Sequence, residues 1–138
     1  MPVFERLIKE GLMWVEGDVG SLERELAQLA RELTAPQPGQ CVLCFVQRML
    51  TQFDCDTTLR WAKRWRDLRA PQATALEHRL GARGGSCDCE IFWNGWEPVI
   101  DPATGTMAWP DADYGCRGVP HWSSQPCSIW TPRRRGWR

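Results

Sequence analysis

Gly84-Gly85-Ser86-Cys87-Asp88-Cys89-Glu90 is the stretch around which the chain is organised. It places two cysteines one residue apart, directly after a pair of glycines. The other five cysteines lie on both sides of it: Cys41, Cys44, Cys55, Cys116 and Cys127. Seven thiols spread along 138 residues in this way predict a small domain tied together by thiolate ligands, with zinc as the metal.

Length and cysteine count limit the class of protein. A chain of 138 residues is long enough for one domain with a buried core. Charged residues interrupt the first apolar stretch, so no secretory signal is expected, and no apolar run is long enough to span a membrane. We therefore expect a cytoplasmic protein, in which metal binding or redox chemistry is a better explanation of the cysteines than a disulfide framework.

The formal net charge is zero, but the charges are unevenly distributed. Residues 1–40 hold seven acids and four bases, whereas residues 60–83 hold seven bases and two acids. The closing residues 131–138 hold four arginines. Solvated faces that pair with one another explain this pattern better than a site for a polyanion.

Residues 1–34 are predicted to form a helical hairpin. Residues 2–16 have the apolar spacing of an amphipathic helix, and Gly17-Asp18 with Gly20 is expected to end it. Ser21 is a suitable N-cap for a second helix. That helix carries a narrow apolar stripe, which either packs within the fold or serves a helix of another chain: Leu22, Leu26, Leu29 and Leu33.

A cysteine-rich helical core is predicted over residues 41–97, after the linker 35–39. Its first helix, 41–53, is apolar on most of its circumference and should lie at the centre of the core. A second helix is expected over 58–69, capped by Asp56 or Thr57. A third begins near Pro71 and ends at about Arg83, where Gly84-Gly85 allows a left-handed cap.

Residues 87–95 are expected to be a short strand or an extended turn. In extended chain, alternate side chains face the same way, so Cys87 and Cys89 would lie opposite Asp88 and Glu90. Residues 98–138 form an irregular arm rich in Trp and Pro. The predicted fold is mainly α with a short β or irregular cysteine-rich part, that is, a small metal-stabilised α+β domain.

Two motifs resemble a bacterial family known as domain of unknown function 2695. The first is Cys55-Asp56-Thr57-Thr58-Leu59-Arg60 with Trp65 downstream, and the second is Gly84-Gly85-Ser86-Cys87-Asp88-Cys89-Glu90-Ile91 with Asn94. A Cys-x-x-Cys upstream and two cysteines downstream are typical of the longer actinobacterial members. The resemblance implies no activity. Many relatives have His at the position of Thr57, where it would complete a site of three sulfurs and one nitrogen.

The cysteines allow more than one partition between metal ions. The simplest gives one closed site of Cys41, Cys44, Cys116 and Cys127. Cys55, Cys87 and Cys89 then form an incomplete triad, with His121 or His78 as fourth ligand. Alternatively, Cys41, Cys44, Cys87 and Cys89 form a single site. Without metal, buried free cysteines would act as small apolar residues.

The function predicted from these patterns is a zinc-binding accessory or protein-interaction module with no catalytic residue, holding one or two zinc ions per chain. Its expected partner is another protein, and the oligomeric state is not indicated. One alternative is a thiol redox protein using Cys41 and Cys44. Another is a nucleic-acid-binding module using the Trp/Arg helix 58–69 and the arginine tail. Zinc hydrolysis is disfavoured because Asp88 and Glu90 are expected to face away from the ligands.

Overall fold

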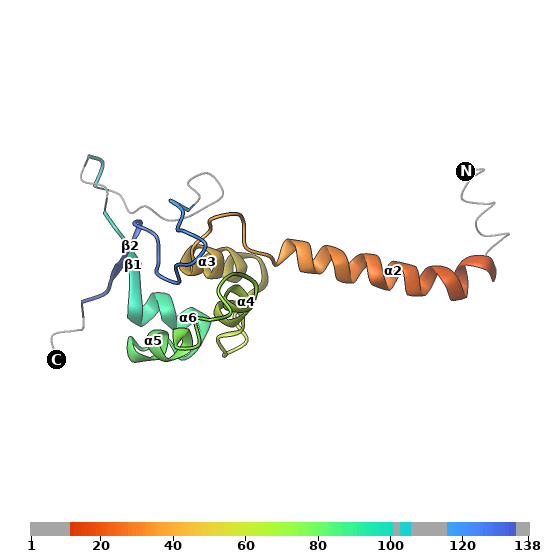
Figure 1. Cartoon of the computed structure of the whole chain (residues 1–138), viewed down its shortest axis with the longest axis horizontal. Coiled ribbons are helices and arrows are strands. Elements are labelled where there is room, and N and C mark those ends of the chain that lie inside the picture. The colour runs from red at the N-terminus through yellow and green to blue at the C-terminus, as the bar shows by residue number, and fades with distance from the viewer. Residues whose placement is uncertain (1–11, 101–102, 106–115, 135–138) are drawn as a thin grey trace. The chain divides into compact units, whose positions relative to one another are not determined.

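The computed structural model describes residues 12–100, 103–105 and 116–134. The chain divides into two compact units, Met1–Ala35 and Pro36–Arg138. Its described elements follow one another as α2 (Leu12–Leu33), α3 (Val42–Phe53), α4 (Arg60–Arg69), α5 (Leu76–Ala82), α6 (Asp88–Glu90), the π-helical turn η1 (Ile91–Gly95), β1 (Trp96–Pro98) and β2 (Trp130–Pro132) (Figure 1). The predicted class, mainly helical with a small β part, is confirmed. No described helix is both long and apolar enough to cross a membrane.

The first unit contains α2, which runs without interruption from Leu12 to Leu33. The turn predicted at Gly17-Asp18 and Gly20 is therefore wrong, and so is a hairpin that depends on it. A glycine inside a helix costs only about 1 kcal/mol relative to alanine, so the good helix formers that follow, from Leu22 to Leu33, can offset the cost of these glycines. The part of the prediction that concerns residues 1–11 lies outside the described residues.

The core of the second unit is built around α3. Six of its residues are buried: Val42, Leu43, Cys44, Phe45, Val46 and Met49. This confirms the prediction that the helix over 41–53 is central. Trp65 of α4 is 1% exposed, and its indole N–H donates to the carbonyl of Gln40 at 2.9 Å, just before α3 begins. The tryptophan therefore contributes both apolar area and a hydrogen bond to this packing.

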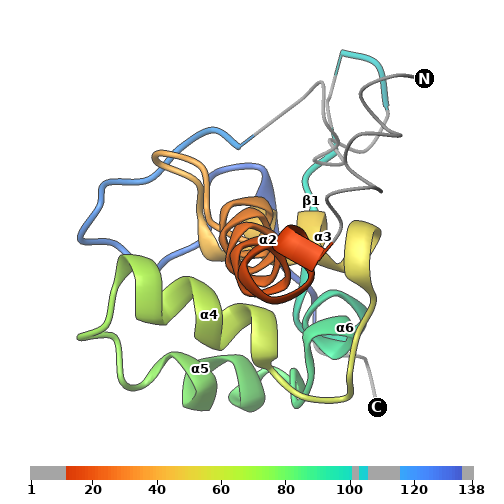
Figure 2. The same cartoon turned by 90° about the vertical axis from the view of Figure 1, so that its right-hand side faces the viewer.

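α4 packs on α3 on one side and on α5 on the other (Figure 2). α4 begins two residues later than expected, at Arg60. α5 is much shorter than the helix predicted from Pro71, because residues 71–75 form turns, with the N–H of Ala73 bonded to the carbonyl of Ala70 at 2.8 Å. After α5, Gly84 has φ +86°, which confirms the left-handed cap.

Residues 88–95 are helical, so the short strand or extended turn predicted over 87–95 is wrong. Cys87 is extended, but α6 and η1 follow it directly. This conformation turns Asp88 into the protein, where it is fully buried, and places Ile91 and Phe92 in the core. Local alternation of residue types cannot reveal that a carboxylate has a buried partner elsewhere in the chain.

The C-terminal segment is held to the core by β1 and β2. These strands pair antiparallel, with Glu97 opposite Thr131. Arg133 extends the attachment, because its Nε donates to the carbonyl of Phe92 at 2.7 Å and its guanidinium lies 3.0 Å from the Glu97 carboxylate. These two contacts hold Arg133 against η1 and β1.

We predict that Gly84→Ala lowers the free energy of unfolding by about 2 kcal/mol. A Cβ at this position would sit at φ +86° and only 2.8 Å from the Cβ of Asn94. Gly81→Ala is the matched control: its Cβ would have no atom within 4 Å, so the helix should gain up to about 1 kcal/mol. Denaturant unfolding measures both changes, and equal effects of the two substitutions would contradict this role of Gly84.

Candidate metal centre

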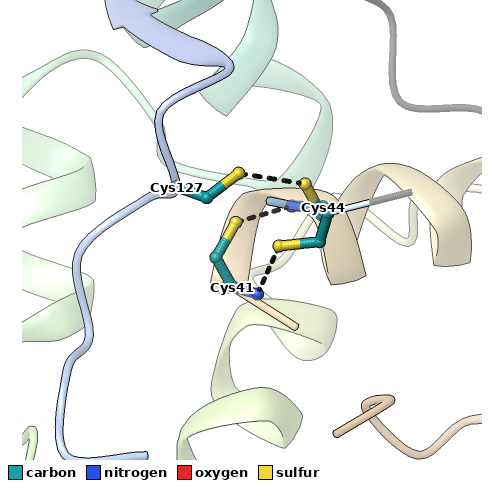
Figure 3. A group of neighbouring side chains, drawn as sticks. Cys41, Cys44 and Cys127 are labelled. Carbon is teal, nitrogen blue, oxygen red and sulfur yellow. Dashed lines mark hydrogen bonds between the residues drawn. The ribbon is translucent and has the colours of Figure 1, made fainter. Parts of the chain in front are cut away.

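Four of the seven cysteines bring their sulfur atoms together. The Sγ atoms of Cys41, Cys44, Cys116 and Cys127 all lie within 4.8 Å of one another. Cys41, Cys44 and Cys127 turn their sulfurs towards each other, with 3.6 Å between those of Cys44 and Cys127 (Figure 3). Four thiolates at about 2.3 Å from one zinc ion would lie about 3.8 Å apart, so a small contraction of this cluster would bring it to tetrahedral geometry.

The N-terminus of α3 supplies two of these sulfurs. Cys41 is the N-cap residue, and its sulfur accepts a hydrogen bond from the backbone N–H of Cys44 at 3.4 Å. The three-residue spacing therefore places both thiols at the start of one helix. The N–H groups and the helix dipole at this end favour negative charge on a ligand placed there.

The C-terminal segment supplies the other two sulfurs. Cys116 accepts hydrogen bonds from the backbone N–H of Cys41 and of Gly118, each at 3.2 Å. Gly118 has φ +87°, a conformation that suits glycine and that lets its N–H turn back to the sulfur two residues earlier. The N–H of Val119 then donates to the carbonyl of Gly39 at 2.8 Å and fixes this segment beside the start of α3.

Each of the four sulfurs thus has at least one N–H donor. After the larger effects of Cys116, Cys41 and Cys44, a hydrogen bond from the backbone N–H of Ile129 also lowers the pKa of Cys127. The indole N–H of Trp130 donates to the sulfur of Cys44 at 3.3 Å. Sequence analysis missed Trp130, although its position three residues after Cys127 places it beside the cluster. Donors arranged around sulfur stabilise the charged form, as they do around the ligands of metal sites.

The pKa values of the four thiols are displaced in opposite directions. Hydrogen bonding with Cys116 and then with Cys127 raises the pKa of Cys41 and of Cys44. The pKa of Cys127 is lowered by hydrogen bonds with Cys116, Cys41 and Cys44. For Cys116, the contact with Cys127 raises the pKa, but those with Cys41 and Cys44 outweigh it and bring the pKa to about 6. Cys41 and Cys44 therefore hold their protons, whereas Cys116 and Cys127 lose theirs more easily and accept hydrogen bonds as thiolates.

Burial makes a cation the natural counterpart of this cluster. Cys41, Cys44 and Cys127 are at most 4% exposed. Several thiolates packed together away from water are strongly destabilised unless a positive charge joins them. The donor set is four sulfurs without a carboxylate, which suits a soft or borderline metal in tetrahedral geometry rather than calcium or magnesium. The cluster could accordingly hold one metal ion.

The remaining three cysteines are neighbours but do not form an equally tight group. Burial raises the pKa of Cys55, but hydrogen bonds from the backbone N–H groups of Cys89 and Thr57 and from the thiols of Cys89 and Cys87 together outweigh it and lower that pKa. Burial, followed by the effect of Cys55, raises the pKa of Cys87 and brings that of Cys89 to about 11. Within the described ranges, only the four-cysteine group has all its donor atoms within 4.8 Å.

Among the described residues, neither histidine belongs to a group that could hold a metal ion. His121 and His78, which were candidates for a fourth ligand, are both exposed, and neither appears with the sulfurs in the part of the chain that the structure describes. The alternative site that combined Cys41 and Cys44 with Cys87 and Cys89 is not assembled, because the latter pair lies outside the four-sulfur group.

The geometry weighs against the two alternative functions, thiol redox chemistry at Cys41 and Cys44 and nucleic-acid binding by the Trp/Arg helix 58–69. All seven cysteines are free thiols, and Cys41 and Cys44 are buried, which denies a disulfide substrate access to them. On α4, Arg60 donates to the carbonyl of Asp54 at 3.2 Å and lies 4.3 Å from the centre of the Trp61 ring, while Arg66 pairs with Glu77. These guanidinium groups support the fold, which favours the structural interpretation of the Trp/Arg helix.

Asp88 joins the two sequence motifs. Its carboxylate accepts the backbone N–H groups of Trp61 at 3.0 Å and Ala62 at 3.2 Å, and so caps α4 from a distant part of the chain. Its own N–H donates to the carbonyl of Thr58 at 3.0 Å. Burial raises the pKa of Asp88 to about 6 against the effect of the two N–H donors. The Asp88 carboxylate thus stabilises the start of α4. Asn94 stabilises the turn at Gly84, because its side-chain amide donates to the Gly84 carbonyl at 2.9 Å.

We predict that Asp88→Ala lowers the free energy of unfolding by about 2 kcal/mol, because two N–H groups in the interior lose their acceptor. Asp67→Ala is the control. Asp67 lies on α4, the helix that Asp88 caps, and its side chain is 67% exposed, so its removal should change the free energy of unfolding by less than about 0.5 kcal/mol. Urea unfolding of both variants provides the measurement. A loss for Asp88→Ala no larger than that of the control would refute the capping role.

Comparison with protein-family models matches residues 42–94 to the family described as "Protein of unknown function (DUF2695)". Neither the curated proteins nor the solved structures gave a match. The matched segment begins with α3 and ends at Asn94, so it contains both motifs and Cys44 but leaves Cys41, Cys116 and Cys127 outside. The family recognised from the two motifs is therefore the one whose model matches, and the match covers residues 42–94 of the chain.

Proposed function

We propose that the chain is a small zinc-binding module in which Cys41, Cys44, Cys116 and Cys127 hold one Zn²⁺. The observation that carries this proposal is the cluster of four sulfurs, mostly buried and each with an N–H donor. Zinc is the divalent metal most often held by four cysteines at structural sites.

The proposed role of the ion is structural. Four sulfurs fill all four positions of a tetrahedral ion, so no position is open for water or a substrate. Asp88, the buried carboxylate of the second motif, is engaged with the start of α4 and cannot serve the cluster as a base. The module therefore acts as an accessory or protein-interaction domain rather than as a hydrolytic enzyme.

The ion would join two parts of the chain that otherwise have few regular contacts. Cys41 and Cys44 precede or begin α3, whereas Cys116 and Cys127 lie in a segment whose only described strand is β2. A segment with so little secondary structure loses much entropy when it becomes ordered. Coordination by two of its residues would offset that cost, and binding of the ion would then be coupled to folding.

The test is the metal content of the full chain, purified without chelator. We expect about one zinc per chain, retained through gel filtration. Cys127→Ser should remove it, because serine keeps the shape of cysteine but is a poor zinc ligand. Cys89→Ser is the matched control and should keep the zinc, since Cys89 lies outside the four-sulfur group.

The same samples report on folding. Removal of zinc by a strong chelator should reduce the near-ultraviolet circular dichroism of the native tryptophans, and added zinc should restore it. Absence of zinc, or a Cys127→Ser variant that keeps it, would overturn the proposal. Two zinc ions per chain, with one lost in Cys89→Ser, would contradict the single-ion stoichiometry and place a second ion at Cys55, Cys87 and Cys89.

A further inference from the structure

The helix α2 exposes a continuous apolar line. We call it the α2 seam, and its five members are between 47% and 57% exposed: Val19, Leu22, Leu26, Leu29 and Leu33. Large apolar side chains that are exposed singly are ordinary, but a contiguous row of them on one helix is typical of an interaction surface.

The spacing along the α2 seam alternates strictly between three and four residues. At 100° per residue, the five side chains fall within a sector of about 80°. An apolar face that packs on a globular core is wider, whereas a seam this narrow corresponds to the a and d positions of a coiled coil. Val19, Leu26 and Leu33 then occupy a positions, and Leu22 and Leu29 occupy d positions.

The described hydrophobic core belongs to the second unit, since its residues lie between Cys41 and Trp130. α2 itself belongs to the separate unit Met1–Ala35. A single helix of 22 residues whose leucines are exposed gains little stability by itself, and a second helix laid along the α2 seam would bury those leucines.

The charges of α2 indicate which kind of helix would fit. Glu23 flanks the seam on one side, and Glu25 and Glu32 flank it on the other, about 80–100° from its centre by the helical repeat. Arg24 and Arg31 lie on the opposite face. The described e and g positions therefore include acids and no base.

We propose that the α2 seam docks an amphipathic helix of another protein, with apolar residues at a and d positions and Lys or Arg at e and g. Such a partner would bury the leucines and pair its bases with the acidic flanks. A second copy of α2 fits less well, because its flanks carry no base for these glutamates and its arginines face away. The proposal goes beyond the zinc site, since α2 contains no cysteine.

The test uses two synthetic peptides of about four heptads with identical Leu and Ile at a and d. One has Lys at every e and g position, and the other has Glu there. Calorimetry with the zinc-loaded full chain should show binding of the Lys peptide, weakened by salt, and at least about tenfold weaker binding of the Glu peptide.

Matched variants of the full chain make the result specific to the α2 seam. Leu26→Asp should weaken binding of the Lys peptide at least about tenfold, because it buries a charge in the seam. Gln28→Asp adds the same charge on the far side of the helix and should leave the affinity within about twofold. Glu25→Lys combined with Glu32→Lys should transfer the preference to the Glu peptide.

Three results would overturn the proposal. The first is failure of the full chain to bind either peptide. The second is equal binding of both peptides, which would mean that the flanking charges do not select the partner. The third is self-association of the free chain in sedimentation experiments that Leu26→Asp abolishes, which would make a second copy the occupant. Zinc content measured on every variant separates these outcomes from failure of the metal site.

Discussion

The hydrogen bonds that converge on four cysteine sulfurs are the interaction on which the second unit depends. The start of α3, the turn at Gly118 and the indole of Trp130 all direct N–H groups at sulfur. This arrangement is suited to thiolates and poorly suited to neutral thiols, which are weak acceptors. The C-terminal segment approaches the core at this cluster and at the short pairing of β1 with β2. If the sulfurs were left charged without a cation, their mutual repulsion would oppose the contact that holds the segment in place.

A second constraint, the buried carboxylate of Asp88, organises the remainder of the unit independently of the sulfur cluster. It ties the second motif to the start of α4, while Gly84 and Asn94 shape the turn that leads into α6. The family match covers this part of the chain, but three of the four clustered cysteines lie outside it. The chain therefore combines a helical segment that matches the family model and a sulfur cluster built largely from the flanking residues.

Sequence reasoning was most successful where local chemistry determines the structure. The three-residue spacing of Cys41 and Cys44 predicted that both thiols lie on the same side at the start of a helix, as they do. The glycine pair after α5 predicted a left-handed cap, and Gly84 has positive φ. It failed where a residue distant in the sequence determines the local conformation. The helical structure at 88–95 places the Asp88 carboxylate at the start of α4, and the residues next to Asp88 in the sequence do not indicate that contact. The grouping of Cys116 and Cys127 with Cys41 and Cys44 was one of several open partitions, because spacing alone does not say which loops approach each other. α2 continues through Gly17 and Gly20 because a single glycine destabilises a helix only weakly. The sequence prediction gave these glycines too much weight as helix breakers.

The most direct test of the central claim is X-ray absorption at the zinc edge on the zinc-loaded full chain. A tetrathiolate site gives a first shell of four sulfurs at about 2.3 Å and no lighter donor. That spectrum would establish that Cys41, Cys44, Cys116 and Cys127 act together as ligands, provided that Cys127→Ser abolishes it. A first shell containing nitrogen or oxygen at about 2.0–2.1 Å would show that histidine, carboxylate or water completes the site, and would contradict the closed four-sulfur centre.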